Sequence, residues 1–172
     1  QKFKIITALS VFYHLQNPNN FLRDVSKLLD NKKGIFLLEH TDLLSIIKKN
    51  LFDTICHEHL EYYSVEVIIN MAIKNNLRVF DIGTNNVNGS SVRFFICHKD
   101  AKFKTKKNKI NSYIKQENKA GLKNKRCYKS FFNRVLLIKK KIKKDYKKNK
   151  CRWSNYSWLW SLNQRKCITS IF

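Results

Sequence analysis

The chain has 172 residues and a formal net charge of +23, with 43% hydrophobic and 27% charged residues. This length fits one truncated domain with a helical extension, and no apolar run is long enough to cross a bilayer. Five cysteines without framework spacing argue against a disulfide scaffold and favour reduced thiols in a cytoplasmic protein.

Strands and helices are predicted to alternate along the first hundred residues. Four short runs predict strands, at residues 4–8, 35–38, 77–82 and 92–97. Apolar residues recur at helical spacing from Phe21 to Leu29, and Ser64 can cap a second helix with one apolar face. This alternation favours an α/β fold in which helices pack on a layered sheet.

The segment 52–64 is the richest in proton-handling side chains, with two histidines, several acids, a thiol and two phenols. A histidine can accept and release a proton near neutral pH, and a carboxylate beside it can orient the ring. In an extended segment His57 and His59 would share a face, whereas in a helix His59 would lie with Tyr62 and Tyr63. The segment is a candidate active site, although polar residues at the mouth of a loop would give the same pattern.

A zinc site is the competing interpretation of the same histidines. His57 and His59 could be joined by Cys56, Cys97 or His40. The spacing is not that of a helical His-Glu-x-x-His pattern, and no Cys-x-x-Cys pair occurs in the chain. We therefore predict no metal site.

Residues 52–64 resemble the Phe/Tyr-Asp-x-Ile-x-His-Glu-His-Leu-x-Tyr-x-Ser motif of the sugar C-methyltransferases, which are class I S-adenosylmethionine-dependent enzymes. Two further matches occur in the family's order. Residues 5–15 and 17–25 resemble a strand, a cofactor-contacting loop and the helix that follows. Residues 88–93 resemble the family's Gly-Gly-Ser-x-Arg turn and strand, so that the resemblance covers about residues 3–140.

This resemblance implies a fold and a domain organisation. The fold would be a partial Rossmann-like methyltransferase sheet with the late strands only, followed by a helical linker into a truncated C-terminal domain. Residues 1–100 would form the C-terminal half of the methyltransferase domain, residues 101–150 a basic helical segment, and residues 151–172 an out-of-frame tail. The parent enzyme would use S-adenosylmethionine and a nucleotide-linked deoxysugar, and its oligomeric state is left open.

The resemblance also implies roles for individual residues. His59 would take a proton from a carbon or hydroxyl of the sugar, with Glu58 assisting, because transfer from a sulfonium needs a carbanion-like or enolate nucleophile held in line. The other candidate catalytic residues are His57 and Cys56. The candidate cofactor-binding residues are Thr7, Ala8, Ser10 and His14. The candidate substrate-binding residues are Tyr62, Tyr63, Gly89, Ser91 and Arg93, although Arg93 could equally be an ordinary strand-edge cation.

The chain departs from the family pattern at two motif positions. Cys56 stands where the family often has tyrosine, which removes a phenol that could hydrogen-bond a substrate. Ser90 replaces the second glycine of the Gly-Gly-Ser turn, and a serine there would be strained if the site required a positive φ.

The Gly-rich turn of a class I methyltransferase is missing from the sequence. The chain has four glycines, and none forms a Gly-x-Gly pair. We therefore expect an internal fragment that lacks the first half of its nucleotide-binding sheet, and we expect that this chain alone does not bind the cofactor measurably.

From Lys99 the composition becomes rich in lysine and asparagine, and apolar positions between Tyr128 and Ile142 predict a long helix whose basic end is Lys139 to Lys150. This charge could mark a basic, non-catalytic nucleic-acid-binding module, since such binding is largely counterion release. We favour a solvated helix face, because no arginine cluster or aromatic stacking pattern accompanies the charge. Nucleic acid is therefore not the expected partner.

The last 22 residues, 151–172, carry all three tryptophans, and their pattern suits neither a strand nor a helix. Because tryptophan has the single codon TGG, reading one base later makes Trp158 and Trp160 glycines, and suitable codons then give GYGASTKGN. That string resembles the motif that opens the family's C-terminal domain. We expect a frameshift near Lys150, with a genuine aromatic docking tail as the alternative.

Overall fold

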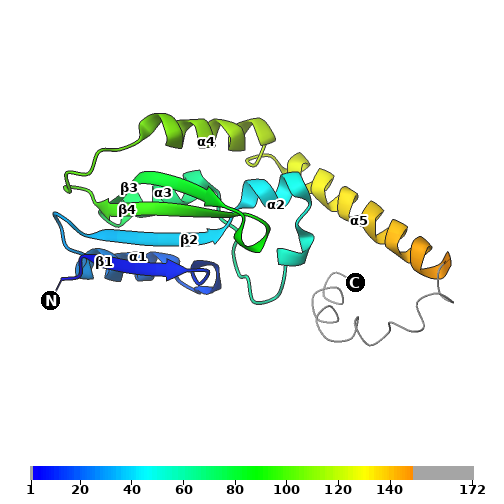
Figure 1. The fold of residues 1–172 in the computed structure, drawn as a ribbon, viewed down its shortest axis with the longest axis horizontal. Coiled ribbons are helices and arrows are strands. Elements are labelled where there is room, and N and C mark those ends of the chain that lie inside the picture. Colours follow the sequence, from blue (N-terminus) through cyan, green and yellow to red (C-terminus); the bar gives the residue numbers. More distant parts are fainter. Residues whose placement is uncertain (1, 149–172) are drawn as a thin grey trace.

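Alternating strands and helices build a mixed α/β fold in the computed structural model, which describes residues 2–148 (Figure 1). The strands of these residues are β1 (Ile5–Leu9), β2 (Ile35–Thr41), β3 (Leu77–Asn85) and β4 (Ser91–His98). Their α-helices are α1 (Pro18–Leu28), α2 (Leu43–Lys49), α3 (Val65–Lys74), α4 (Lys107–Ala120) and α5 (Lys125–Lys148). Short 3₁₀ turns lie at Phe12–His14, Phe52–Thr54 and Val87–Gly89. The predicted α/β fold is confirmed.

The strands form one sheet in the order β1-β2-β4-β3. β1 and β2 run parallel, with Ala8 opposite Leu38, whereas β4 pairs antiparallel with both β2 and β3. A parallel pair needs a crossover connection, and α1 supplies it between β1 and β2. The carboxyl ends of β1 and β2 therefore meet at one edge of the sheet, where the loops that follow them lie together.

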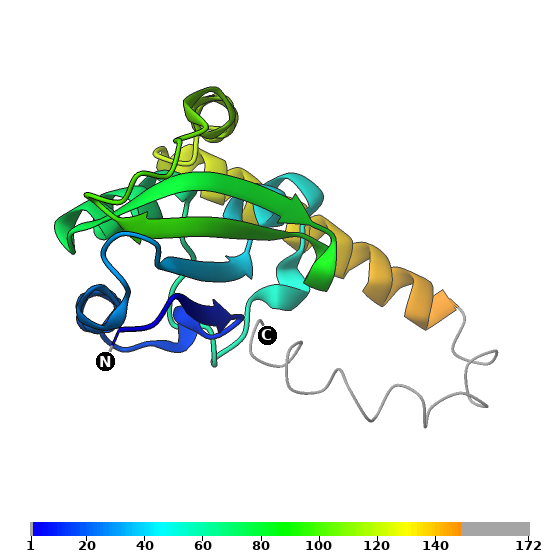
Figure 2. The same cartoon turned by 60° about the vertical axis from the view of Figure 1, so that its left-hand side comes forward.

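One face of the sheet carries the main core. Side chains alternate along β2, so that Phe36, Leu38 and His40 point to the same face, and each is at most 1% exposed. Helices α1 and α3 lie behind the sheet in Figure 1, and the turned view in Figure 2 agrees. The opposite face is more open, since Ile5 is 71% exposed and Leu9 is 50% exposed.

Side-chain caps fix where the helices on this sheet begin. Asn17 accepts a hydrogen bond from the Asn20 amide at 3.0 Å, directly before Pro18 at the first turn of α1. Ser64 caps α3 as predicted, and its hydroxyl accepts from the Val67 amide at 3.4 Å. The Ser64 signal therefore places the start of α3 correctly, whereas α1 begins at Pro18, before the predicted Phe21.

Helix α2 is an element that the sequence analysis did not predict. Its residues follow β2 almost without a break, because β2 runs to Thr41 rather than ending at Leu38. The Asp42 carboxylate starts the helix by accepting from the amides of Leu44 and Ser45, at 3.1 and 3.0 Å. Helix α2 thus carries the chain from the strand end towards the segment 52–64.

Helix α5 confirms the long helix predicted between Tyr128 and Ile142. Its first half packs on α2, where Phe131 and Val135 are buried together with Ile46 and Ile47. Arg134 fastens this contact by donating to the Ile47 carbonyl at 2.7 Å and to the Asn50 amide oxygen at 2.7 Å. The tail at residues 151–172, with its expected frameshift, lies outside the described residues.

Candidate active site

The carboxyl end of β1 and the segment 56–60 meet in a small cluster of aromatic and imidazole rings. The ring of His59 lies 4.1 Å from the ring of Tyr13 and 5.2 Å from the ring of His14, measured between centroids. Two hydrogen bonds hold the segments together. The Leu60 amide donates to the Tyr13 carbonyl at 2.9 Å, and His14 Nδ1 lies 2.6 Å from the Glu58 carbonyl. Two predicted site residues far apart in the sequence, His14 and His59, are therefore neighbours.

His59 is arranged to stay neutral. Burial lowers its pKa below the ordinary value, and the neighbouring His14 lowers it further, whereas the Thr54 carbonyl and the Glu58 carboxylate oppose the shift. Within residues 2–148, His59 Nδ1 is buried and makes no hydrogen bond of normal geometry. Because Nδ1 is buried, the nitrogen of this neutral imidazole that can accept a proton at physiological pH is Nε2.

The other three candidate catalytic residues lie at the outside of this cluster. His57 and Glu58 form an exposed pair, with 3.8 Å between His57 Nε2 and Glu58 Oε1. Among the described residues the Glu58 carboxylate makes no hydrogen bond to His59, and it acts on that ring only through its charge. Cys56 is a partly buried free thiol whose carbonyl accepts from the His59 amide at 3.2 Å.

Tyr62 and Tyr63 point to different surroundings. Tyr62 lies 6.0 Å from the His59 ring, and its hydroxyl donates to the Thr54 carbonyl at 3.2 Å. Tyr63 is 7% exposed and packs on Phe12, with 5.3 Å between the rings. Burial raises the pKa of Tyr63 to about 12, so the phenol stays protonated. Tyr62 therefore belongs to the cluster, whereas Tyr63 belongs to the core.

The candidate cofactor-binding residues of β1 and its loop are not gathered on one surface. Ala8 is 4% exposed and faces the core, Thr7 is exposed on the opposite face, and His14 joins His59. Ser10 has a left-handed φ of 57°, a strained conformation for a serine, and its amide donates to the Glu39 carbonyl at 2.9 Å. Thr7 and Ala8 therefore face opposite sides of the sheet and cannot line one surface together. Together with the missing Gly-x-Gly turn, they do not form a complete site for S-adenosylmethionine.

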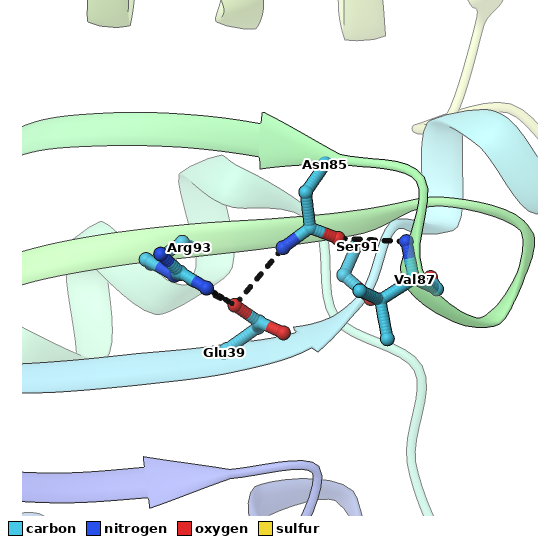
Figure 3. A network of polar contacts seen from close by, with 5 residues as sticks. All are labelled: Glu39, Asn85, Val87, Ser91 and Arg93. Atoms are coloured by element: carbon cyan, nitrogen blue, oxygen red, sulfur yellow. Dashed lines mark hydrogen bonds and ion pairs between the residues drawn. The ribbon is translucent and has the colours of Figure 1, made fainter.

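The candidate substrate-binding residues of β4 take part in a polar network between strands (Figure 3). Arg93 donates to Glu39 Oε2 from Nε at 2.7 Å, with Nη2 2.6 Å from the same oxygen. Asn85 donates to that oxygen at 3.1 Å, and its own amide oxygen accepts from the Val87 amide at 2.9 Å. Ser91 donates to the Val87 carbonyl at 3.0 Å. Arg93 and Asn85 thus tie β4 and β3 to β2, and Ser91 is bonded to the turn between β3 and β4.

The strain considered for Ser90 does not arise. Ser90 has a φ of 172°, which is extended backbone that any residue adopts. The positive φ of this turn falls on Gly89, at 85°, where a Cβ would also lie 3.1 Å from Leu51 Cδ1. The turn therefore requires a glycine only at position 89, where the chain has one.

Sequence reasoning missed two buried carboxylates that organise this region. Glu39 is 5% exposed and anchors the network of Figure 3. Glu117 of α4 is 3% exposed and accepts from the amides of Val65 and Glu66, at 2.7 and 3.4 Å, so that it covers the start of α3. Glu39 sits at the end of a predicted strand, which is a usable signal. Nothing in the pattern marks Glu117, whose partners are about fifty residues earlier.

No group of three or more histidine, cysteine, aspartate or glutamate side chains in the described part of the chain is arranged to hold a metal ion. None of the helices described in residues 2–148 is both long and apolar enough to span a membrane.

Comparisons with known proteins relate the chain to C-methyltransferases. Residues 86–152 match the family model of the C-methyltransferase C-terminal domain. The chain is also 34% identical over 92 residues to the C-methyltransferase NovU of Streptomyces niveus. That match covers 54% of this chain and 22% of NovU, so the chain spans about a fifth of the length of this relative. The resemblance to C-methyltransferases is confirmed.

Among solved structures, the chain is similar to magnesium protoporphyrin IX methyltransferase (ChlM) of Synechocystis PCC 6803, crystallised with bound SAH. The TM-score is 0.43 and the identity 13%, over 56% of this chain and 45% of that one. At this level the likeness assigns neither a substrate nor a binding site to this chain.

Proposed function

We propose that this chain carries the acid–base part of an S-adenosylmethionine-dependent C-methyltransferase that acts on a nucleotide-linked sugar in the cytoplasm. The observation that carries the proposal is the partly buried His59, whose lowered pKa keeps it neutral beside His14. The match to C-methyltransferases supports the reaction type. The His-Glu-His motif and its resemblance to the sugar enzymes support the substrate class.

The chemistry required of His59 follows from the reaction type. A sugar carbon becomes a nucleophile when it lies next to a carbonyl and loses its proton, because the C–H electron pair can then move onto the carbonyl oxygen as an enolate. His59 would take that proton on Nε2, since its Nδ1 is buried. The Glu58 carboxylate would stabilise the imidazolium through its charge, which raises the pKa of His59.

The roles proposed for His59 and Glu58 do not include binding of the methyl donor. When bound, S-adenosylmethionine supplies an electrophilic methyl group, but Thr7, Ala8, Ser10 and His14 do not complete a site for it. We expect calorimetric titration of the 172-residue chain with S-adenosylmethionine to give no measurable heat of binding. Tight stoichiometric binding would overturn that expectation.

Proton removal can be tested without the methyl donor. The chain is incubated in D₂O with a nucleotide-linked keto-deoxysugar, and NMR follows loss of the signal of the proton beside the carbonyl. We expect catalysed exchange of that proton and loss of the catalysis in His59→Gln. Exchange at the same rate in the variant, or none above the buffer rate in the wild type, would contradict the proposed role. His98→Gln is the matched control, because His98 lies at the end of β4, next to Asp100 and outside the ring cluster.

A further inference from the structure

The segment 52–64, which carries the candidate base, lies between the end of α2 and the start of α3. Helix α2 contacts both α4 and α5, and helix α3 contacts α4. Figure 1 shows α2 beside the turn at which α4 leads into α5. One later part of the chain, residues 107–148, which we call the α4–α5 pair, therefore lies against both ends of the segment.

Glu117 of α4 holds the end of the segment that leads into α3. The first amides of a helix have no partner within the helix, and Glu117 accepts from those of Val65 and Glu66, at 2.7 and 3.4 Å. Ser64, the last residue of the segment, accepts from the following amide, that of Val67. Glu117 and Val65 are 3% and 1% exposed, so water does not replace the carboxylate unless the contact opens. The first turn of α3 is therefore fully capped only when α4 lies against it.

Arg134 of α5 holds the other end of the segment. Asn50 ends α2 with a left-handed φ of 57°, and its carbonyl accepts from the Phe52 amide at 2.8 Å. Arg134 donates to the Asn50 amide oxygen and to the Ile47 carbonyl, each at 2.7 Å. The same guanidinium donates to the Ser130 hydroxyl at 2.9 Å, which fixes its direction on α5. Arg134 therefore holds the residue at which the chain turns from α2 into the segment.

The segment has little packing of its own to fix its shape. Within residues 52–64 only Tyr63 is buried. The contacts that bring His59 to the turn after β1 are the bond from the Leu60 amide to the Tyr13 carbonyl and the approach of His14 Nδ1 to the Glu58 carbonyl. A segment with few buried apolar contacts opens at a low cost in free energy. Its geometry therefore depends strongly on how its two ends are held.

We propose that the α4–α5 pair clamps the candidate active site, with Glu117 and Arg134 as positioning residues that determine where His59 lies. Each of the two acts through the backbone at one end of the segment. The catalytic consequence rests on the proposed function, whereas the positioning of His59 does not. Residues 86–152, which match the C-methyltransferase C-terminal domain, include the clamp but not the segment. The part of the chain that matches this domain thus sets the geometry of a site that precedes it in the sequence.

Backbone hydrogen exchange of the full 172-residue chain, followed by NMR without substrate, tests the positioning. The Leu60 amide is the reporter, because its bond to the Tyr13 carbonyl exists only while the segment lies against the turn after β1. Glu117→Ala should speed exchange of the Leu60 amide about tenfold, since two amides at the start of α3 lose their acceptor. Arg134→Met should act in the same direction from the other end. Glu117→Gln, which keeps one acceptor oxygen, should have a smaller effect than Glu117→Ala.

Asp81→Asn is the matched control. Asp81 pairs with Lys106 and Lys109 at the opposite end of α4, at 2.9 and 3.0 Å, so this change loosens α4 away from the segment. It should leave the Leu60 amide protected, and the amides of the central strand β4 should stay protected in every variant. The same loss at Leu60 in Asp81→Asn, or an equal loss at Leu60 and in β4 in Glu117→Ala, would reduce the clamp to a contribution to overall stability. Unchanged protection of Leu60 in both Glu117→Ala and Arg134→Met would overturn it.

Exchange of the substrate proton in D₂O then separates the clamp from the proposed function. With both in place, Glu117→Ala should lower the rate at saturating substrate about tenfold, in step with the opening at Leu60. Opening at Leu60 in a chain whose wild type catalyses no substrate exchange would support the clamp and contradict the role of His59. Substrate exchange that is lost in His59→Gln but keeps its full rate in Glu117→Ala, with Leu60 still protected, would support the role of His59 and overturn the clamp.

Discussion

Two groups of polar side chains lie near the end of β2 and next to the end of β1, and they are used in opposite ways. In the network around Glu39, the carboxylate oxygen Oε2 accepts from both Arg93 and Asn85, and Asn85 is also bound to Val87 (Figure 3). In the ring cluster around His59, the imidazole keeps a buried nitrogen without a hydrogen bond among the described residues.

The difference separates residues that stabilise the sheet from residues available for chemistry. A carboxylate as buried as Glu39 is tolerated because a cation and an amide satisfy it, so these groups have little capacity left for a ligand. A neutral histidine with unused capacity costs stability and is retained more readily where it reacts. We therefore expect changes in the network to act on folding and changes in the ring cluster to act on catalysis.

The largest effect expected is on the rate of proton exchange in His59→Gln. Loss of a general base should lower that rate by about 10²- to 10⁴-fold. The free energy of unfolding should change by less than about 0.5 kcal/mol, because the side chain is only partly buried. Urea unfolding and the D₂O exchange assay measure the two quantities separately. If His59→Gln lost much stability but little exchange, His59 would serve the fold in the same way as the network around Glu39.

Removing the cation of the network should instead destabilise the fold. Arg93→Met leaves the Glu39 carboxylate, 5% exposed, with Asn85 as its remaining side-chain donor. We expect a loss of about 2 kcal/mol in the free energy of unfolding, reduced from the value for fully buried pairs because Arg93 is partly exposed. The double variant Glu39→Gln/Arg93→Met should lose less than Arg93→Met alone. Equal stability of wild type and Arg93→Met would mean that this pair contributes nothing to the fold.

Sequence reasoning predicted the helices and strands better than it predicted the network around Glu39 and the ring cluster around His59. Strand runs, Ser64 and the stripe along α5 are local signals, and each lies where it was predicted. Helix α2 was missed because its apolar residues, Leu43 to Ile47, form a short run whose length cannot separate a strand from a helix. The side-chain partners of Glu39 come from two other strands, β3 and β4, and His14, the neighbour of His59, comes from the turn after β1. Such contacts are set by tertiary packing.

The turn that closes the network gives a smaller effect. Gly89→Ala should lower the free energy of unfolding by about 1–2 kcal/mol, because an alanine would adopt a φ of 85° and press on Leu51. Ser90→Gly is the comparison variant, since Ser90 is extended and gains nothing from the freedom of glycine. Thermal unfolding of both variants decides the matter. If Ser90→Gly stabilised the protein and Gly89→Ala left its stability unchanged, the strain of this turn would lie at Ser90 and not at position 89.

His40 lies on the opposite face of β2 from Glu39 and makes stability depend on pH. Burial lowers its pKa, so below the ordinary value near 6.5 the unfolded chain takes up a proton that the folded chain does not. This contribution lowers stability as the pH falls through 6.5, and it is absent above that value. His40→Phe should reduce the loss of stability between about pH 7.5 and pH 5.5, measured by urea unfolding. An unchanged pH dependence would assign the effect to other groups, such as His59.

The smallest effect is expected at Glu58. Like Glu39 in the network, Glu58 places a carboxylate beside a side chain that is cationic or can take up a proton. Its carboxylate is exposed and paired with His57 at 3.8 Å, so Glu58→Gln should change the free energy of unfolding by less than about 0.5 kcal/mol. The charge of Glu58 raises the pKa of His59, so Glu58→Gln should shift the pH profile of proton exchange to lower pH. The rate of exchange should fall less than tenfold, which corresponds to a change of about 1 kcal/mol or below in the activation free energy. Glu61→Gln is the matched control, because Glu61 acts on Tyr63 instead. If both variants moved the profile equally, the shift would reflect the overall charge of the segment, and Glu58 would have no specific part in supporting His59.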